Sequence, residues 1–410
     1  MIHLYELPIC FILVGILLYA VLAGADFGAG IWQLTATGSN RLAAEIRDHA
    51  HESIAPVWEA NHVWLIFVLT VLWTAYPTAF GSIASTLSVP LFIAAIGIIF
   101  RGTTYALRSA AASAREIRAV DTVFAVSSIL TPFALGAMIG GIASRRVPVG
   151  NAAGHLFSSW LNPTSLMIGL LAVASSAYLA AVYLAADAVR LGKPELEREF
   201  RNRALITGFV GGVLAVIGLV VVHGDAHPLY HRLLHSAGLA GVIISGLAGI
   251  GTLVLVAQRR FELARFSAAL AVAGIIGGWA LAQRPLLLPG LTVHQAAAPH
   301  DTLVAVVVAV LAGALILGPS LALLFRLVLG GAFEGYSASS EAVALGAGDV
   351  IRASSAGLLA RAAGALLLAG VGFLTIADAG WAHAIGVICL LAFVVVGFGA
   401  VGPGELAEEP

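Results

Sequence analysis

Three polar side chains stand at the start of a long apolar run in SIAPVWEANHVWLIFVLTVLWTAY, which covers residues 53–76. Glu59 and His62 are three positions apart and would share one face of a helix, with Asn61 between them. A carboxyl group that is partly withdrawn from water can bind and release a proton near neutral pH, so Glu59 is a candidate proton-uptake group. The alternative is that Glu59 only faces the positive end of a helix dipole.

Two further charged residues lie inside apolar segments: Asp26 in AGADFGAG and Arg101 in IIFRGTTYALR. Glycines on both sides of Asp26 leave room for another helix to approach. Asp26 therefore has two interpretations, a second group on a proton pathway or a structural residue that packs or caps a helix end. Arg101 is explained by snorkelling of its guanidinium to the membrane surface, and an ion pair with Asp26 or Glu59 is the alternative.

Histidine is the commonest side chain to ligate a metal or a haem. His62 and His383 lie well inside apolar segments, but neither has a second histidine at ligand spacing. His62 is therefore interpreted as part of a polar network within a bundle. Cys10 and Cys389 lie in apolar runs, and the chain lacks CxxC and HExxH motifs, so no metal site is predicted.

The remaining histidines of interest lie between the apolar runs. Four of them recur at every fourth position: His223, His227, His231 and His235. That spacing is typical of a metal-binding helix face, but Gly224 and Pro228 argue against a continuous helix, and an external loop is expected instead. His49 and His51 are expected to be solvated.

Membrane helices are the elements that must position these side chains. The chain has 410 residues, of which 60% are hydrophobic and only 10% charged, and its mean hydropathy is +0.98. Soluble domains carry about 25% charged residues, so the composition excludes an ordinary soluble domain. The formal net charge of −1 excludes a role in binding nucleic acid through bulk electrostatics.

Eleven apolar runs approach the length of about 20 residues that a helix needs to cross a bilayer. Backbone polar groups in lipid must be satisfied internally, so the expected fold class is all-α, a polytopic transmembrane helical bundle. The expected spans cover residues 8–33, 58–80, 85–107, 121–143, 164–187, 204–223, 237–257, 265–283, 302–326, 355–377 and 380–402. The first run is too long for a cleaved signal peptide and is expected to be retained.

Basic residues predict the orientation of these spans. Of the 21 Lys and Arg residues, 17 lie in or beside the odd-numbered connections and 4 beside the even-numbered ones. Cytoplasmic connections carry the excess of Lys and Arg, so the N-terminus is expected outside and the C-terminus inside. This orientation places Glu59 near the cytoplasmic end of the second span.

The segment SIAPVWEANHVWLI resembles the signature of subunit II of the cytochrome bd-type quinol oxidases. Further stretches resemble the same family in matching order: GADFGAG, FRGTTYALRS, SSILTPFALGAMIGG, LNPTSLMIGLL and TVHQAAAPHDTL. The resemblance covers about residues 1–330. The family typically has nine spans, so residues 331–410 are expected to form a C-terminal extension with two more, which pack against the bundle or stand in for small accessory subunits.

The resemblance implies a subunit of a bacterial cytoplasmic-membrane complex that oxidises quinol and reduces O₂ to water. The partner would be a larger subunit I that ligates the haems, haem b with haem d or haem b alone, so that this chain ligates none. Some family members also bind a quinone in this subunit, through contacts that the sequence does not identify. Glu59 occupies the position of an acidic residue on the family's proton route, and Asp26 matches the family's first-span acid.

Two functions of other classes are weighed against this one. The first is a secondary transporter or another ion-pathway membrane protein, which would explain the intramembrane acids equally well. A secondary transporter would show paired broken helices or an internal repeat, and no convincing repeat relates the two halves. A purely structural membrane scaffold would differ from the oxidase subunit only in the role of Glu59.

Overall fold

Helices make up nearly all of the structure, a computed structural model that describes residues 3–36, 41–54, 58–108, 113–329, 363–370 and 380–401. The exception among these residues, besides loops, is a short antiparallel hairpin of β1 (Leu286–Leu288) and β2 (Leu291–Thr292). The predicted all-α class is confirmed. The chain divides into two units, Met1–Gly318 and Pro319–Pro410.

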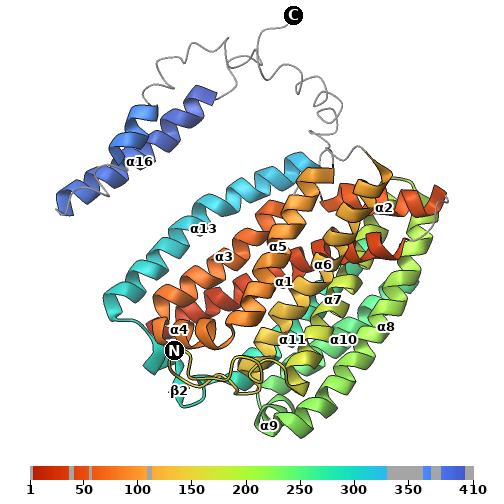
Figure 1. The fold of residues 1–410 in the computed structure, drawn as a ribbon, viewed down its shortest axis with the longest axis horizontal. Coiled ribbons are helices and arrows are strands. Elements are labelled where there is room, and N and C mark those ends of the chain that lie inside the picture. Colours follow the sequence, from red (N-terminus) through yellow and green to blue (C-terminus); the bar gives the residue numbers. More distant parts are fainter. Residues whose placement is uncertain are drawn as a thin grey trace, which may run out of the picture. The chain divides into compact units, whose positions relative to one another are not determined.

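Long helices run side by side in the first unit (Figure 1). They are α1 (Leu7–Thr35), α3 (Trp58–Ala75), α5 (Ser88–Arg108), α6 (Ala114–Ala143), α7 (Pro163–Arg190), α8 (Pro194–Asp225), α10 (Gly238–Ala257), α11 (Phe261–Gln283) and α13 (His300–Leu329), the last of which continues past Gly318. Shorter helices are η1 (Leu4–Glu6), α2 (Arg41–Ile54), α4 (Pro77–Thr86), α9 (His227–His235) and α12 (Val293–Ala296).

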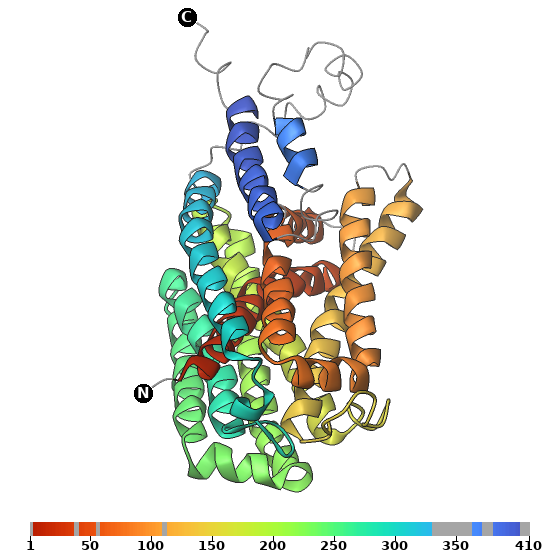
Figure 2. The same ribbon diagram turned by 90° about the vertical axis from the view of Figure 1, so that its left-hand side faces the viewer.

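Helix α1 lies in the interior of the first unit, where it packs against α3, α6 and α7 (Figure 2). Glycines allow this close packing. A Cβ atom at Gly28 would lie 2.0 Å from the backbone oxygen of Ser176 on α7, a distance that no side chain could accommodate without a shift. Close approach at small residues is the usual way in which helices associate within a membrane. The interior position of α1 explains why polar groups on this helix can meet partners from several others.

Among the described residues, seven helices are long and apolar enough to cross a membrane, and the number rises to eight if one bent pair of helices forms a single span. The seven cover Leu4–Thr35, Glu116–Ala143, Pro163–Arg190, Pro194–Asp225, Gly238–Ala257, Phe261–Gln283 and His300–Ser320. Each coincides with one of the predicted spans. The predicted count of eleven is not confirmed in the part of the chain that the structure describes.

The difference is concentrated in the predicted spans 58–80 and 85–107. Helix α3 ends at Ala75 and Pro77 opens α4, so the predicted second span is broken near its end, and only Ala60–Ala75 counts as a shorter apolar helix. Proline has no backbone N–H and is tolerated in the first turn, so that it starts a new helix. The pair of α4 and α5 is then bent by 81°.

The two predicted C-terminal spans lie in the second unit. Of residues 355–377 only 363–370 are described, as helix, and the remainder lies outside the described residues. The predicted span 380–402 corresponds to α16 (Gly380–Val401), whose apolar part is counted over Ala384–Val396 as a shorter helix. Gly370 lies against Leu390 of α16, so the described pieces of this unit contact each other.

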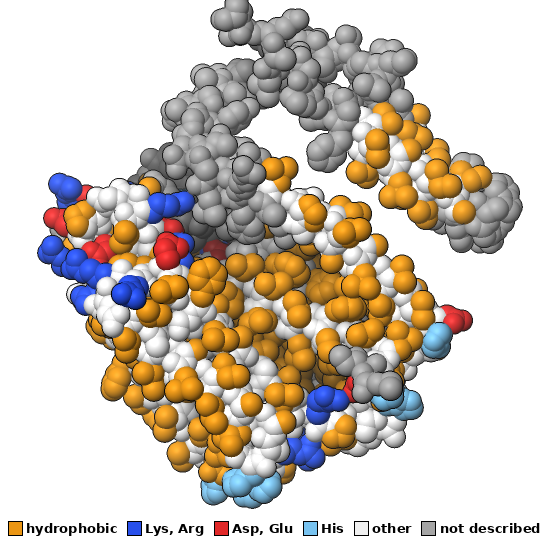
Figure 3. All heavy atoms as spheres, turned by 180° about the vertical axis from the view of Figure 1, so that it is seen from behind, with side chains coloured by type: hydrophobic (Ala, Val, Ile, Leu, Met, Phe, Trp, Pro, Cys, Tyr) orange, Lys and Arg blue, Asp and Glu red, His pale blue; other side chains and the backbone are white. Residues whose placement is uncertain are grey.

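Charged side chains gather near the ends of the helices, and hydrophobic side chains cover the long faces between (Figure 3). The exposed hydrophobic side chains include Val220, Phe266 and Leu315, which are 68–75% exposed. A soluble protein rarely exposes so large a contiguous apolar surface, whereas a membrane protein presents it to lipid. Which end of the helices faces the cytoplasm stays a prediction.

Helices also form in connections between the spans. Residues 41–54 form α2. The histidine-containing connection, predicted as a loop, forms α9, because Pro228 falls in its first turn, where proline is tolerated. The predicted interruption of a continuous helix is present at Ala226, between α8 and α9.

Candidate functional site

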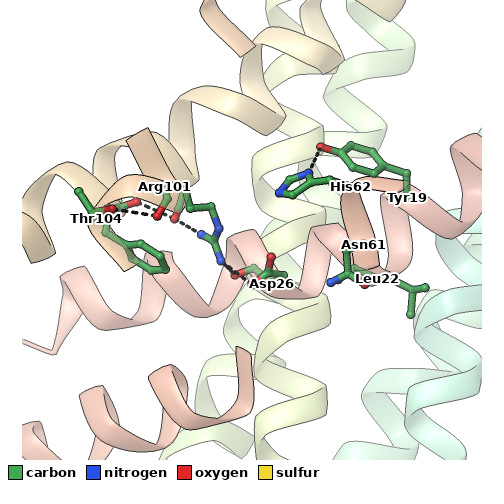
Figure 4. A network of polar contacts seen from close by, with 9 residues as sticks. Tyr19, Leu22, Asp26, Asn61, His62, Arg101 and Thr104 are labelled. Carbon is green, nitrogen blue, oxygen red and sulfur yellow. Dashed lines mark hydrogen bonds and ion pairs between the residues drawn. The ribbon is translucent and has the colours of Figure 1, made fainter. Parts of the chain in front are cut away.

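Polar side chains from four helices meet inside the first unit (Figure 4). We call this group the polar cluster. Helix α1 contributes Tyr19 and Asp26, α3 contributes Asn61 and His62, α5 contributes Arg101 and Thr104, and α6 contributes Ser128. The cluster brings together three of the four residues predicted as candidates from the sequence: Asp26, His62 and Arg101.

An ion pair between Arg101 and Asp26 forms the centre of the polar cluster. Nη2 of Arg101 lies 2.5 Å from Oδ1 of Asp26 and donates a further hydrogen bond of 2.9 Å to the backbone oxygen of Asp26. The side chains are 1% and 4% exposed. The guanidinium is thus buried between helices and does not snorkel to the surface, so the ion-pair interpretation of Arg101 describes the structure.

Ser128 and two aromatic rings complete the surroundings of the guanidinium. Nη1 of Arg101 donates to Oγ of Ser128, which itself donates to the backbone oxygen of Phe124 over 2.7 Å. The guanidinium carbon lies 4.3 Å from the ring centre of Phe124 and 5.1 Å from that of Phe27. Aromatic faces attract cations, so these rings stabilise the charge in a site that water does not solvate.

A glycine makes room for these contacts. A Cβ atom at Gly30 would lie 2.2 Å from Oγ of Ser128 and 3.0 Å from Nη1 of Arg101. The sequence GADFGAG therefore provides both the acidic partner and the space beside it.

Two atoms of the ion pair remain unsatisfied within the described part of the chain. Oδ2 of Asp26 and Nε of Arg101 are buried and have no hydrogen-bond partner among the described residues. A buried acceptor without a partner costs about 1–3 kcal/mol. The arrangement of Asp26 and Arg101 therefore depends on the hydrogen bonds that the other atoms make.

Two polar residues of α3, Asn61 and His62, contact α1. Nδ1 of His62 lies 3.4 Å from the hydroxyl oxygen of Tyr19, and the imidazole lies among the rings of Tyr19 and Phe27. Nδ2 of Asn61 donates to the backbone oxygen of Leu22 over 3.4 Å. These contacts agree with the interpretation of His62 as part of a polar network within the bundle.

Glu59 is the second residue of α3, three positions before His62. Its backbone is helical, so the spacing assumed from the sequence holds. Its side chain lies outside the described part of the structure. The role of Glu59 therefore stays a prediction.

Metal binding finds no support in the described residues. Among them, no group of three or more His, Cys, Asp or Glu side chains could hold a metal ion. The four regularly spaced histidines form two ring pairs: His223 with His227, at 5.4 Å between centroids, and His231 with His235, at 4.7 Å. That this chain ligates no haem stays a prediction.

His49 was predicted to be solvated, and this was wrong. It is 2% exposed, and its Nε2 donates to the backbone oxygen of Leu184 over 3.1 Å, because a carbonyl oxygen can only accept. Helix α2 is amphipathic and buries Ala43, Ile46 and Ala50 at spacings of three and four. That periodicity could have indicated a docked helix from the sequence. Ser128 gave no such signal, because serines are frequent within the spans.

The first unit matches one protein family over nearly its whole length. A family model described as cytochrome bd terminal oxidase subunit II matches residues 4–328. The match ends close to the end of α13.

Individual relatives have related names. The putative cytochrome bd menaquinol oxidase subunit II of Bacillus subtilis (strain 168) is 25% identical over 240 residues, which cover 57% of this chain and 68% of the relative. The cytochrome bd-I ubiquinol oxidase subunit 2 of Escherichia coli (strain K12) is 30% identical over 227 residues, 53% of this chain and 57% of the relative. The alignments thus cover about two thirds of the first relative and little more than half of the second.

The fold is also similar to a solved one. The structure of bd oxidase from Geobacillus thermodenitrificans contains a chain that superposes with a TM-score of 0.62 at 24% sequence identity. The superposition covers 80% of this chain and 98% of that chain. At 24% sequence identity, this similarity is evidence for a shared fold alone.

Proposed function

The chain belongs to the cytochrome bd terminal oxidase subunit II family, and we propose from this premise that it is the second subunit of a bd-type quinol oxidase. The family match over residues 4–328 is the observation that carries the proposal. The reaction of the complex would oxidise two quinols and reduce one O₂ to two waters, with four electrons passing from quinol to oxygen. Reducing oxygen consumes four protons, so the complex needs a proton route to the site of reduction.

The proposed partner is a larger subunit I that ligates the haems, of b type with or without haem d. The haems supply electron transfer and the reduction of oxygen when they are bound in that partner. This chain would support the assembly through its apolar surface, and the proposed location is the bacterial cytoplasmic membrane with the N-terminus outside. In support, seven described helices are suited to cross a membrane.

The proposed proton-uptake group is Glu59. Two features of the described residues support this role. Helix α3 begins at Trp58, so Glu59 stands in the first turn, at the same end of the bundle as Arg41 and Lys193. His62 lies one helical turn further, among the rings of Tyr19 and Phe27, where α3 packs against α1. Protons taken up at Glu59 would pass on along the contact with subunit I.

Asp26 is proposed to act as a structural residue. Its Oδ1 and its backbone oxygen are both held by Arg101, so the carboxylate is fixed between α1 and α5. A proton carrier has to exchange partners as it loads and unloads. The ion pair instead fixes α1, α5 and α6 relative to one another, and this arrangement positions the start of α3, which packs on α1.

The C-terminal extension is proposed to contribute to assembly. Residues 331–410 follow the end of the family match at residue 328, and their described part contains α16 and the helix over 363–370. We propose that this extension packs against the bundle or takes the place of small accessory subunits.

Co-purification tests the proposed function. A tagged chain is extracted from its native membrane in mild detergent, and the preparation is examined for a larger partner, for a reduced-minus-oxidised haem spectrum and for quinol-driven oxygen consumption. All three are expected together. A chain that purifies without haem absorbance or a partner would contradict the proposal and would favour the secondary transporter.

A further inference from the structure

A pocket of about 300 Å³ opens between the end of α7 and the start of α11, far along the chain from the residues of the polar cluster. We call it the α7–α11 pocket. The residues that matter for its chemistry are Val189 on α7, Arg259 and Arg260 in the connection from α10, and Glu262 and Leu263 in the first turn of α11. It lies at the ends of membrane helices, where lipid headgroups would be found.

Arg260 gives this pocket an unneutralised positive charge. Its guanidinium forms no hydrogen bond or ion pair with the described residues. The neighbouring acids are paired with other arginines. Glu197 lies 3.6 Å from Arg259, Glu262 lies 3.7 Å from Arg265, and Asp187 lies 2.5 Å from Arg265.

An apolar strip leads away from the pocket along α11. Leu263, Phe266 and Leu270 are 54%, 75% and 52% exposed and follow one another at spacings of three and four, so they lie on one face of the helix. Val189 adds a further exposed aliphatic side chain, 54% exposed, on the α7 side. The unpaired guanidinium of Arg260 thus lies at the start of the apolar strip.

We propose that the α7–α11 pocket binds the phosphate of an anionic phospholipid, with one acyl chain along the apolar strip of α11. Arginine recognises phosphate through two parallel N–H···O bonds, which makes Arg260 the group that holds the headgroup. Arg259 lies beside it and is paired with Glu197 over 3.6 Å. The apolar strip distinguishes a lipid from free phosphate, which would gain nothing from Leu263 or Phe266. The proposal rests on the membrane location and not on the oxidase function.

Lipid binding to the intact complex in detergent tests the proposal. Native mass spectrometry counts bound molecules as dioleoyl phosphatidylglycerol or dioleoyl phosphatidylcholine is titrated in. The variant is Arg260→Gln, and the matched control is Arg198→Gln, an exposed arginine on α8 near the same end and outside the pocket. Attraction of a basic side chain to an anionic membrane predicts roughly fivefold weaker binding of phosphatidylglycerol in Arg260→Gln and no change in the control.

A second variant tests the apolar strip. Leu263→Ser keeps both arginines and should also weaken the binding of phosphatidylglycerol, while 20 mM inorganic phosphate, a free anion, should not displace the lipid. Equal losses in Arg260→Gln and Arg198→Gln would show only general electrostatic attraction and would overturn the site. Tight binding of phosphatidylcholine, or displacement by inorganic phosphate, would overturn its assignment to an anionic lipid. Thermal unfolding without added lipid confirms that the variants are folded.

Discussion

The guanidinium of Arg101 on α5 is paired with the carboxylate of Asp26 on α1 over 2.5 Å, and both side chains are more than nine-tenths buried. The same guanidinium donates to Ser128 on α6. A single buried side chain therefore connects three helices. Because taking charges out of water is costly, such a pair holds its geometry only while both partners are present.

Removing one partner of this pair should destabilise the protein strongly. Arg101→Gln leaves the Asp26 carboxylate buried without its cation, and the expected loss in the free energy of unfolding is about 3–5 kcal/mol. A lower thermal midpoint and a lower yield of assembled complex would measure it. The double variant Asp26→Asn with Arg101→Gln should recover part of the loss, because no unpaired charge remains.

An exposed ion pair provides the control for this prediction. Arg41 lies 2.6 Å from Glu45 on α2, with the Arg41 side chain 86% exposed. Surface pairs contribute about 0–1 kcal/mol, so Arg41→Gln should leave the midpoint nearly unchanged. If Arg101→Gln proved no more harmful than Arg41→Gln, the ion pair would not organise the bundle as we describe.

The close packing of α1 on α7 can be tested at two glycines of one motif. Gly28→Ala would bring a methyl group to within 2.0 Å of the Ser176 backbone oxygen, whereas at Gly24 the nearest atom, on Leu179, lies 3.5 Å away. Overpacking against backbone costs about 1–3 kcal/mol or more, so Gly28→Ala should lower the thermal midpoint and Gly24→Ala should be tolerated. Equal effects of the two substitutions would contradict the described packing.

The sequence predicted the long helices because an apolar run in lipid has no other way to satisfy its backbone. It did not predict the break at Pro77, because mean hydropathy is insensitive to one proline within an apolar run. The sequence left open whether Arg101 pairs with Asp26 or with Glu59. The choice depends on how α1 and α5 are aligned. Close packing at glycines sets this alignment, and it cannot be read from the sequence. The burial of His49 was open to prediction from the periodicity of α2.

Glu59→Gln tests the proposed uptake group in the assembled complex. The substitution keeps the shape of the side chain and removes its ability to bind and release a proton. We expect quinol-driven oxygen consumption to fall about 100-fold, the lower end of what a positioned acid–base group contributes, with haem content unchanged. Glu59→Asp should retain part of the activity, because a carboxyl group remains.

The matched control for this experiment is Glu45→Gln, which removes a carboxylate from α2 near the same end of the bundle. Its oxygen consumption and the dependence of that consumption on pH should equal those of the unaltered complex. Normal activity with a normal pH profile in Glu59→Gln would exclude the proton role and leave only the structural scaffold.

Truncation after residue 335 tests the C-terminal extension. The first unit ends at Gly318, so the shortened chain keeps all of it. We expect a lower yield of the complex, or loss of haem during purification, because the extension is proposed to stabilise the assembly. Unchanged yield and haem content would show that residues 336–410 serve another purpose.

The 75 positions that separate Asp26 from Arg101 have a consequence for biosynthesis. At about 5–20 residues per second, roughly 4–15 s pass between the synthesis of the acid and that of its cation. An unpaired aspartate in the middle of a bilayer costs about 2.5–3.5 kcal/mol, and α1 carries this cost until its cation has been made. The first helix can therefore reach its final ion-paired state only after α5 has been synthesised, so this contact forms late in the order of translation.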